Sequence, residues 1–278
     1  MGFMGVREPP WRDGEDIDMD YIGRGDPQRT LELLWGTRQP PRRGPKPKLS
    51  VDDIAAAALR IADDEGLSAV TLRRVAEAVG VTAMSLYGYV PGKAELLDLV
   101  ADRAYRDYPM SDDIGADWRT RIEAIARANW TIYLAHPWLL QIAAGRPLPG
   151  PHFTAKYDYE LRAVDGLGLG DIDMDLVVSF VNDYVRGAAR AAVDTLRAET
   201  ETGLSDRQWW ERFGPALGRV LDPGRYPTAI RVGGTAGSEY GAAYDPERAF
   251  DFGVQRLLDG LQPFIEAHRS AVDGTASR

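Results

Sequence analysis

An all-α fold is predicted from the 278-residue sequence on two observations. Apolar residues recur at helical spacing through most of the chain, as in 51–65, where a stripe of Ile and Ala lies between the helix-capping Ser50 and the helix-ending Gly66. No stretch alternates convincingly between apolar and polar residues, as a half-buried strand would. We expect three parts: an N-terminal extension with a basic arm, a small helical domain and a larger helical domain, over 1–44, 45–107 and 108–278.

Two short helices joined by a glycine turn follow the first helix of the small domain. Thr71 is placed to cap a helix that Gly80 soon ends, and Thr82 is placed to cap the next one. Val81 fills the angle between the two helices, and Leu86 faces the same core. This pattern predicts a helix-turn-helix. The alternative is a pair of ordinary helices in a bundle.

The second helix of this pair carries no acidic side chain, since no Asp or Glu occurs from Thr82 to Gly92. An acidic residue there would be repelled by phosphate, so this helix is suited to a nucleic acid. Its first residues can reach base edges in a major groove, and Tyr87, Tyr89 and Lys93 can hold phosphates. We therefore predict that this domain binds double-stranded DNA.

The segment TLRRVAEAVGVTAMSLYGYVPGKAELLDLV resembles the DNA-binding domain of TetR-family transcriptional repressors. Farther along, AHPWLLQIAAGRP and AFDFGVQRLLDGL resemble ligand-domain helices of the tetracycline-repressor branch, so the resemblance spans most of residues 45–268. It implies a three-helix DNA-binding domain followed by a helical ligand-binding and dimerisation domain. Where the best-known member has Gln and Trp, this chain has Ala83 and Gly88, so the operator sequence does not carry over.

Carried over by position, the resemblance implies two kinds of DNA contact. Ala83, Met84 and Ser85 would face base edges, and Thr71 would join the aromatic and basic side chains on phosphates. Arg73 matches a position used for base or backbone contact. Together with the basic arm, the candidate DNA-binding residues are Arg42, Arg43, Lys46, Lys48, Thr71, Arg73, Thr82, Ala83, Met84, Ser85, Tyr87, Gly88, Tyr89 and Lys93.

The basic arm is the stretch RQPPRRGPKPKLS, directly before the first helix of the small domain. Its prolines exclude a helix and favour an extended chain. The whole protein has a net charge of −9, yet this stretch contains no acid. We expect the arm to follow phosphates or to enter the minor groove. The alternative is a flexible linker that is basic by chance.

Upstream of the arm, Thr30 is placed to cap a short helix with Leu31, Leu34 and Trp35 on one apolar face. This helix would dock on the protein itself or on a partner subunit. Residues 1–27 are rich in Asp, Gly and Pro, which favours a disordered extension.

Composition excludes several classes of protein. The absence of cysteine excludes disulfides and thiolate metal sites. No apolar run approaches the roughly 20 residues that span a bilayer, and the N-terminus lacks the apolar segment of a secretory signal. These features predict a cytoplasmic protein with no membrane partner.

The larger domain reads as helical throughout, apart from one predicted mobile loop. That loop runs from Asp222 to Glu247, because proline and glycine are frequent there. The predicted helices cover 118–135, 138–144, 153–167, 176–196 and a final stretch from about Phe250.

A ligand cavity is expected among the helices between 118 and 196, where aromatic and apolar side chains are joined by a few polar ones. For any single residue, an ordinary core or surface role is at least as good an interpretation. The candidates are Trp130, Tyr133, His136, Trp138, Ile142, Phe153, Tyr157, Phe180, Asn182, Tyr184 and Arg186.

No metal site or cofactor is expected. The tetracycline-responsive branch binds a magnesium chelate through a histidine and a glutamate. The resemblance places Ile142 and, approximately, Ala191 at those positions, so a magnesium–tetracycline inducer is not expected.

Two long helices of the larger domain carry stripes too apolar for an exposed helix face. In the family, the equivalent helices pair with their copies as a four-helix bundle. Ordinary intramolecular core is the alternative, and the two interpretations are compatible. The candidate dimer residues are Val177, Val181, Val185, Phe250, Val254, Leu257, Leu258, Leu261 and Phe264.

Together these observations predict a ligand-responsive repressor rather than an enzyme. A homodimer would bind a near-palindromic operator, and a small apolar or amphipathic inducer, such as an antibiotic-like compound, a metabolite or an efflux substrate, would release it. The alternative is a DNA-binding protein whose C-terminal domain is an enzyme or a protein-interaction module with no small-molecule inducer.

Overall fold

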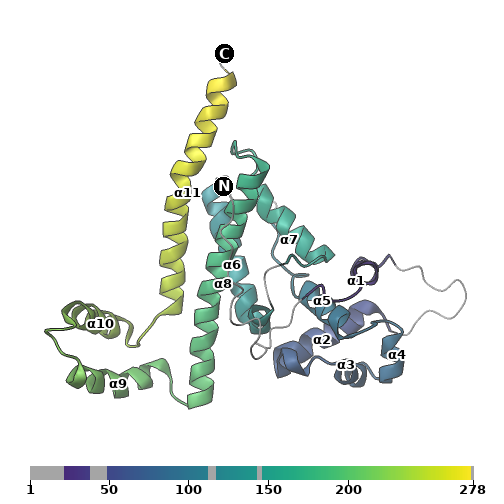
Figure 1. Cartoon of the computed structure of the whole chain (residues 1–278), viewed down its shortest axis with the longest axis horizontal. Helices are drawn as coiled ribbons and strands as arrows, with labels where there is room; N and C mark the ends of the chain where they lie inside the picture. Colours follow the sequence, from purple (N-terminus) through teal and green to yellow (C-terminus); the bar gives the residue numbers. More distant parts are fainter. Residues whose placement is uncertain (1–21, 38–48, 112–116, 143–145, 277–278) are drawn as a thin grey trace, which may run out of the picture.

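The computed structural model describes residues 22–37, 49–111, 117–142 and 146–276, with side chains as far as 270. These residues form helices and no strand, which confirms the all-α fold. None of the described helices is long and apolar enough to cross a membrane. In Figure 1 a small N-terminal group of helices lies to one side of a bundle of long helices. The predicted arm residues Arg42, Arg43, Lys46 and Lys48 lie outside the described residues.

The N-terminal group is held by α5, which packs against α2. Its first helix begins on a capping box, in which the Ser50 hydroxyl accepts from the Asp53 amide and the Asp53 carboxylate accepts from the Ser50 amide, at 3.1 and 2.9 Å. Ile54, Leu86 and Leu96 are fully buried between the helices. The helices are α2 (Val51–Glu65), α3 (Leu72–Ala78), α4 (Ala83–Tyr87) and α5 (Lys93–Ala104).

The helix predicted before the arm exists, but it begins earlier than predicted. It is α1 (Pro27–Leu34), and its cap is Asp26, whose carboxylate accepts from the Arg29 amide at 2.9 Å. The predicted cap, Thr30, is instead a buried residue within the helix. A proline in the first turn behind an aspartate is itself a helix-start signal, and it overrides the threonine three residues later.

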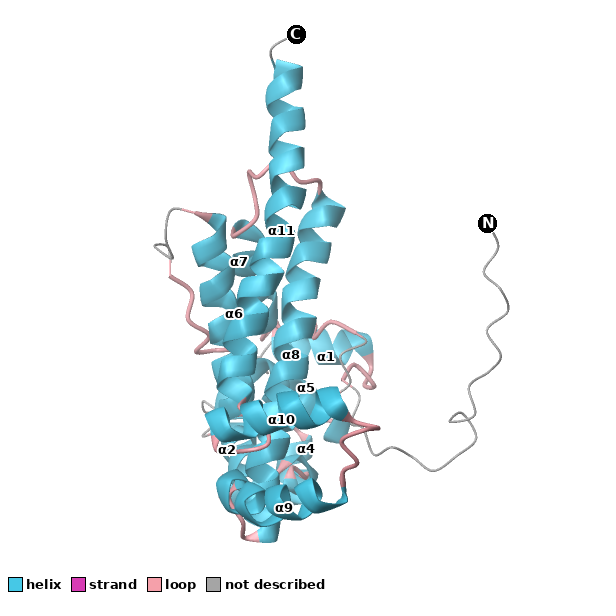
Figure 2. Ribbon diagram, turned by 90° about the vertical axis from the view of Figure 1, so that its left-hand side faces the viewer, coloured by secondary structure: helices cyan, strands magenta, loops and turns pink. Residues whose placement is uncertain are grey.

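Three long helices, α6, α8 and α11, form the second group, and α8 packs against both of the others (Figures 1 and 2). Ile122, Val185 and Leu258 are fully buried where they meet. Helix α7 packs against both α8 and α5, so it joins the two groups. The elements are α6 (Trp118–Ala135), the 3-10 helix η3 (Pro137–Gln141), α7 (Pro151–Arg162), α8 (Asp171–Thr202) and α11 (Pro246–Ala276).

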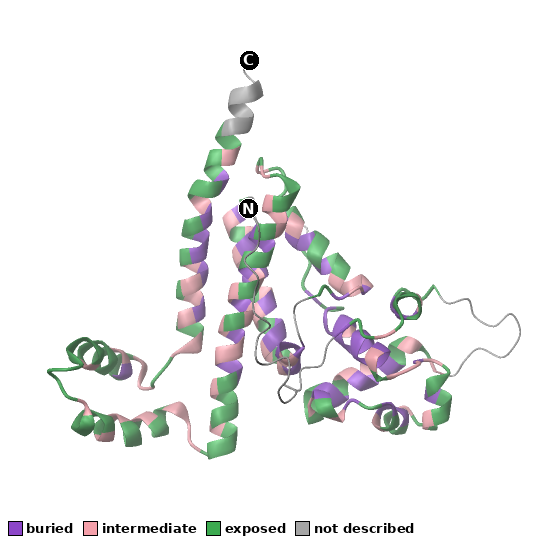
Figure 3. Ribbon diagram, in the orientation of Figure 1, coloured by how far each residue is buried: buried purple, intermediate pink, exposed green. Residues whose placement is uncertain are grey.

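The prediction of a mobile loop from Asp222 to Glu247 is wrong. The segment contains α10 (Pro227–Tyr240), which packs against α9 (Asp206–Val220). Proline is tolerated in the first turn of a helix, and Gly237 leaves space for a side chain of α9, because a Cβ there would lie 2.1 Å from the Trp210 ring. The glycines therefore mark close packing between two helices. This hairpin is largely exposed (Figure 3).

Candidate functional site

Two threonine caps and one glycine fix the turn between α3 and α4. The Thr71 hydroxyl accepts from the Arg74 amide at 3.1 Å, and the Thr82 hydroxyl accepts from the Ser85 amide at 3.2 Å. Gly80 has a φ of +72°, which a residue with a Cβ adopts only at a cost. These local interactions set the angle between the two helices, and α4 lies at the outer edge of the N-terminal group (Figure 1).

The predicted DNA contacts that the structure describes lie at this end of the N-terminal group. Met84 is 81 % exposed and Tyr87 is 51 % exposed. Ala83 and Tyr89 are half-buried and pack against the core, so only part of each side chain faces outward. The exposed members are Thr71, Arg73, Thr82, Met84, Ser85, Tyr87, Gly88 and Lys93. Their contact with DNA stays a prediction.

Two neighbouring arginines of α3 have different partners. Arg73 Nε lies 3.1 Å from Glu77 Oε1 on the same helix, and the Arg73 side chain is 86 % exposed. Arg74 Nε donates to Glu65 Oε1 of α2 at 3.1 Å, and this hydrogen bond lowers the pKa of the Glu65 carboxyl. Exposed ion pairs are weak, so Arg73 can exchange Glu77 for another anion. Arg74 instead ties α3 to α2.

Helix α1 lies beside the same end of the molecule. A shallow groove separates α1 from the turn between α4 and α5, and Tyr87 and Tyr89 line it together with Arg29. The predicted apolar face of α1 is only partly buried. Leu34 packs inward as expected, together with Leu33, whereas Leu31 and Trp35 are 43 % and 48 % exposed.

The chain before α1 is fastened to α5 by two close contacts. The Gly23 amide donates to Asp98 Oδ1 at 2.8 Å, and Asp98 is fully buried. Burial raises the pKa of the Asp98 carboxyl, with the neighbouring Glu95 acting in the same direction. At Gly25 a Cβ would lie 2.5 Å from Glu95 Oε1, so a larger residue there would push the Glu95 side chain aside.

The same N-terminal segment reaches a cavity in the second group of helices. Trp35 Nε1 donates to the Pro149 carbonyl at 2.9 Å, in the chain that leads into α7. Ile22 is buried and lines the cavity itself. Residues 22–35 therefore connect the cavity wall with the groove beside α4.

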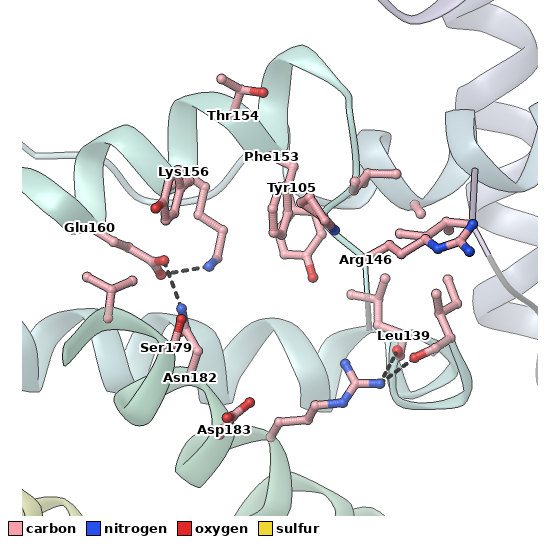
Figure 4. Close-up of a pocket in the computed structure, with 18 of the residues that line it drawn as sticks. Tyr105, Leu139, Arg146, Phe153, Thr154, Lys156, Glu160, Ser179, Asn182 and Asp183 are labelled. Atoms are coloured by element: carbon pink, nitrogen blue, oxygen red, sulfur yellow. Dashed lines mark hydrogen bonds and ion pairs between the residues drawn. The ribbon is translucent and has the colours of Figure 1, made fainter. Parts of the chain in front are cut away.

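The cavity has a volume of about 620 Å³ and lies among α5, α6, α7 and α8 (Figure 4). This volume falls in the usual range for small-molecule sites, roughly 300 to 1,000 Å³. Four aromatic rings line it, those of Tyr105, Tyr133, Phe153 and Tyr157. Toward its outer edge, α8 contributes Ser179 and Asp183.

Six of the predicted ligand residues line this cavity: Tyr133, Ile142, Phe153, Tyr157, Asn182 and Arg186. Their contact with a ligand stays a prediction. Five others lie elsewhere: Trp130, His136, Trp138, Phe180 and Tyr184.

The five misplaced candidates have identifiable partners or exposure. The Trp130 ring stacks on Phe250 at a centroid distance of 4.3 Å. His136 Nδ1 and Trp138 Nε1 both lie 2.7 Å from Asp63 Oδ1, so they join η3 to α2. These aromatic residues bind helices together rather than surround a cavity.

On α8, helical phase separates the candidates that line the cavity from those that do not. Asn182 and Arg186, one turn apart, face the cavity. Phe180 is 54 % exposed on another face. The Tyr184 hydroxyl donates to the carbonyls of Ala249 and Phe250, at 3.0 Å each, and so packs under α11.

Sequence reasoning missed a buried polar cluster on the cavity wall. Lys156 Nζ lies 2.7 Å from Glu160 Oε1, and both side chains are almost fully buried. The i, i+4 spacing of the two residues was visible in the sequence, but it is the same spacing as an exposed helix pair. Only the packing of α7 against α5 and α8 reveals that this pair lies inside.

Arg186 fastens η3 to α8 as well as lining the cavity. Its guanidinium donates to the carbonyls of Leu139 and Leu140 at 3.4 and 3.3 Å, and also to that of Ile142. It also lies 5.8 Å from the centre of the Tyr133 ring. The carbonyls at the end of η3 thus gain donors that the short helix itself does not supply.

Helix α5 links the cavity to the N-terminal group. Ala101 and Tyr105 line the cavity from α5. Asp102 accepts from the amides of His152 and Phe153 at 3.1 and 2.9 Å and so caps the start of α7. Burial raises the pKa of the Asp102 carboxyl. A shift of α7 relative to α5 would therefore disturb both the cavity and this cap.

Most of the predicted dimer residues face the core of one protomer rather than its surface. Eight of them are buried within one protomer: Val177, Val181, Val185, Phe250, Val254, Leu257, Leu258 and Leu261. They form the core between α6, α8 and α11, so the alternative of intramolecular core holds for them. Phe264 is 37 % exposed, and other apolar residues exposed on these two helices are Ile172, Leu176, Phe180, Leu196 and Phe252.

Across the described residues, no three His, Cys, Asp or Glu side chains gather where they could hold a metal ion.

Comparison with known proteins places both groups of helices in one family. The sequence model for "Bacterial regulatory proteins, tetR family" matches residues 49–100, and that for "Tetracyclin repressor-like, C-terminal domain" matches residues 111–265. The HTH-type transcriptional repressor DrrR1 of Streptomyces coeruleorubidus is 42 % identical over 248 residues, which cover 89 % of this chain and 90 % of that protein. The class A tetracycline repressor from Escherichia coli is 27 % identical over 77 % of this chain and 91 % of that protein.

Solved structures agree on the fold. Apo ActR from Streptomyces coelicolor superposes with a TM-score of 0.64 at 23 % identity, covering 80 % of this chain and 99 % of that one. ActR in complex with actinorhodin gives the same TM-score of 0.64 at 24 % identity, covering 77 % and 96 % of the two chains. With both of its helical groups matched over most of their length, this chain belongs to the tetR family of bacterial transcriptional regulators.

Proposed function

We propose that this protein is a ligand-responsive repressor that acts in the cytoplasm as a homodimer on a near-palindromic operator. The observation that carries the proposal is the position of α5. This helix packs against α2, the helix that supports the helix-turn-helix, and Ala101 of α5 and its C-cap residue Tyr105 line the cavity. A ligand that moves α5 therefore moves the DNA-binding helices with it.

In this proposal α4 is the recognition helix. Its exposed Met84 suits apolar contact with thymine methyl groups, while Ser85 and Thr82 offer few bidentate contacts to bases. DNA shape and the basic arm would supply the remaining specificity. Phosphates would be held by Thr71, Arg73, Tyr87, Tyr89 and Lys93, and along the arm by Arg42, Arg43, Lys46 and Lys48.

The ligand would enter the cavity between α7 and α8. Its aromatic walls suit an apolar or amphipathic molecule, and the few polar side chains suit a defined orientation. Coupling between ligand and operator is typically about 1 to 3 kcal/mol, and it requires that the ligand prefer the conformation that does not bind DNA.

The dimer would form on the exposed apolar face of α8 and α11 rather than on the buried stripe. Ile172, Leu176 and Phe180 recur every fourth residue on α8 and are all more than half exposed. Two copies would place their recognition helices roughly 34 Å apart on successive major-groove faces. Sedimentation equilibrium tests this: Leu176→Arg should shift the protein toward monomer, and an unchanged dimer would contradict the placement.

A ligand-release assay tests the function as a whole. DNA selected by the protein from random duplexes is labelled, and its anisotropy is followed while a broad compound panel, including actinorhodin, is added. We expect at least one compound to release the wild-type protein but not Ser179→Trp, which blocks the edge of the cavity. Ser238→Trp, exposed on α10, is the matched control. If no compound releases DNA and a catalytic turnover or protein partner is found instead, the C-terminal domain has another role.

A further inference from the structure

The buried pair on the cavity wall restricts the chemistry of the ligand. The side chains of Lys156 and Glu160 are 5 % and 1 % exposed, and Nζ lies 2.7 Å from Oε1. Burying two charges is costly unless each is also well hydrogen-bonded. The hydrogen bonds of the two partners therefore show what the cavity still offers to a ligand.

The carboxylate of Glu160 is already supplied with donors by the protein. Its Oε1 accepts from Tyr108 Oη at 3.2 Å and from Asn129 Nδ2 at 2.7 Å, in addition to Lys156. Its Oε2 accepts from Asn182 Nδ2 at 3.0 Å (Figure 4). A ligand donor would have to displace one of these partners, so this carboxylate is not the group that a ligand would bind.

The ammonium of Lys156, in contrast, has more donors than the protein supplies with acceptors. It has three N–H donors, and the acceptor that the described residues give it is Glu160 Oε1. Its other neighbours are the rings of Tyr105, Tyr108 and Phe153, with centroids 5.7, 5.4 and 5.5 Å from Nζ. Ring faces attract a cation but provide no oxygen or nitrogen acceptor. Lys156 lines the cavity, so its remaining donors are within reach of a ligand (Figure 4).

Charge balance in the cavity favours an uncharged acceptor. The charged side chains of its wall are three basic and three acidic ones: Arg146, Lys156, Arg186, Glu160, Asp175 and Asp183. Lys156 is moreover neutralised by Glu160 at contact distance. A carboxylate entering this end would be desolvated without gaining a net positive partner. A carbonyl oxygen would gain the hydrogen bond at a much smaller desolvation cost.

We propose that the ligand of this cavity is an aromatic compound with an uncharged carbonyl oxygen that accepts a hydrogen bond from Lys156 Nζ. The rings of Tyr105, Phe153, Tyr133 and Tyr157 contact its aromatic faces and edges. The inference rests on the proposed function, because it names the ligand class for the same cavity. A ligand without the acceptor would leave N–H groups unpaired in a desolvated cavity.

Three fluorescent probes of one ring system test the acceptor directly. Acetylanthracene carries a neutral carbonyl, ethylanthracene replaces that carbonyl with a methylene of similar shape, and anthracenecarboxylate carries a negative charge. We expect the full-length wild-type protein to bind acetylanthracene on the order of tenfold more tightly than either of the other two. Equal binding of the acetyl and ethyl probes would overturn the proposal, as would no binding of any probe or tightest binding of the carboxylate.

The double variant Lys156→Met with Glu160→Gln assigns the difference to this pair. It removes both charges at once, so neither is left buried alone. We expect the preference for the acetyl over the ethyl probe to disappear, while the ethyl probe binds as before. The matched control is Arg162→Met with Asp158→Asn, an exposed pair with the same spacing on the same helix. A preference that survives in the double variant would overturn the assignment.

A second measurement needs no variant. The carbonyl stretching frequency of acetylanthracene bound to wild type should be lower than in an apolar solvent, because a hydrogen bond from an ammonium weakens the C=O bond. An unshifted frequency would contradict the proposal even if the double variant failed to fold. Operator affinity is measured with the same probes. Binding that depends on Lys156 without any change in operator affinity would support this inference and count against ligand-released repression.

Discussion

The end of the molecule around α4 and the cavity between α7 and α8 are built in different ways. At the end around α4, both α3 and α4 begin on a threonine that caps an amide three residues later, and Gly80 makes the turn between them. At the second, side chains from α5, α6, α7 and α8 meet across long sequence separations. Exposed residues at the first end, such as Met84, can change with little effect on the fold, whereas the cavity wall is also the core.

The largest expected effect is on stability, and it distinguishes the cavity wall from the exposed face of α4. Lys156→Met alone leaves the Glu160 carboxylate buried without its cation, and we expect the free energy of unfolding to fall by about 3 to 5 kcal/mol. Adding Glu160→Gln should restore most of the loss. By contrast Met84→Ala, on the exposed face of α4, should change stability by less than about 0.5 kcal/mol.

Urea unfolding of the three variants and the wild type at one pH provides the comparison. If Lys156→Met were as stable as Met84→Ala, the pair would not be buried in solution and the distinction between the two regions would fail.

The next effect concerns DNA binding alone. Replacing Arg42 and Arg43 together with Ala should weaken operator binding about as much as Tyr87→Ala, on the order of tenfold. The two arginines should also reduce the slope of log affinity against log salt by about 2, because each phosphate contact contributes about one unit. Anisotropy titrations over a range of salt concentrations measure both quantities.

The thermal unfolding midpoint of these variants should stay at the wild-type value, since Tyr87 is half exposed and contributes little core. A loss of affinity with an unchanged salt slope would show that the arm does not touch phosphate.

The contrast explains what sequence alone could predict. Caps and glycines act within a few residues, so the range of α2, the turn at Gly80 and the range of α6 could be read from local spacing. Phe180 and Asn182 are two residues apart on one helix, and only the packing of α7 decides that Asn182 faces the cavity. The same limit applies to Val185, whose apolar stripe cannot show whether the core or a second subunit covers it.

Asp98 on α5 anchors the chain before α1, and the pH dependence of stability tests this anchor. Burial raises the pKa of its carboxyl above the ordinary 3.8, so the folded protein holds that proton more tightly than the unfolded chain. This contribution to stability is fully present below pH 3.8 and is lost as the pH rises through the folded-state pKa.

Asp98→Asn removes that loss, because the amide carries no charge to desolvate and its oxygen can still accept from the Gly23 amide. We expect the variant to be about 1 kcal/mol more stable than wild type at pH 7 and to show a smaller difference in acid. Unfolding curves across this pH range test the sign. A variant less stable at pH 7 would show that the charged form is favoured by contacts other than the Gly23 amide.

The smallest effect tests the contact that joins the two regions through the N-terminal segment. Trp35→Phe removes the indole donor to the Pro149 carbonyl but keeps an aromatic ring. Because Trp35 is 48 % exposed, the cost in stability should be no more than about 0.5 to 1 kcal/mol. Trp209→Phe, 38 % exposed on α9, is the control for loss of an indole.

The informative readout is hydrogen exchange of the hydrogen-bonded amides of 152–154, at the start of α7, and of those in α4. With the Pro149 carbonyl released, the amides at the start of α7 should exchange faster, because the anchor of the preceding chain to α1 is lost. If α1 transmits this change, α4 should also exchange faster in Trp35→Phe and not in Trp209→Phe. Faster exchange confined to 152–154 would mean that the two regions communicate through α5 alone.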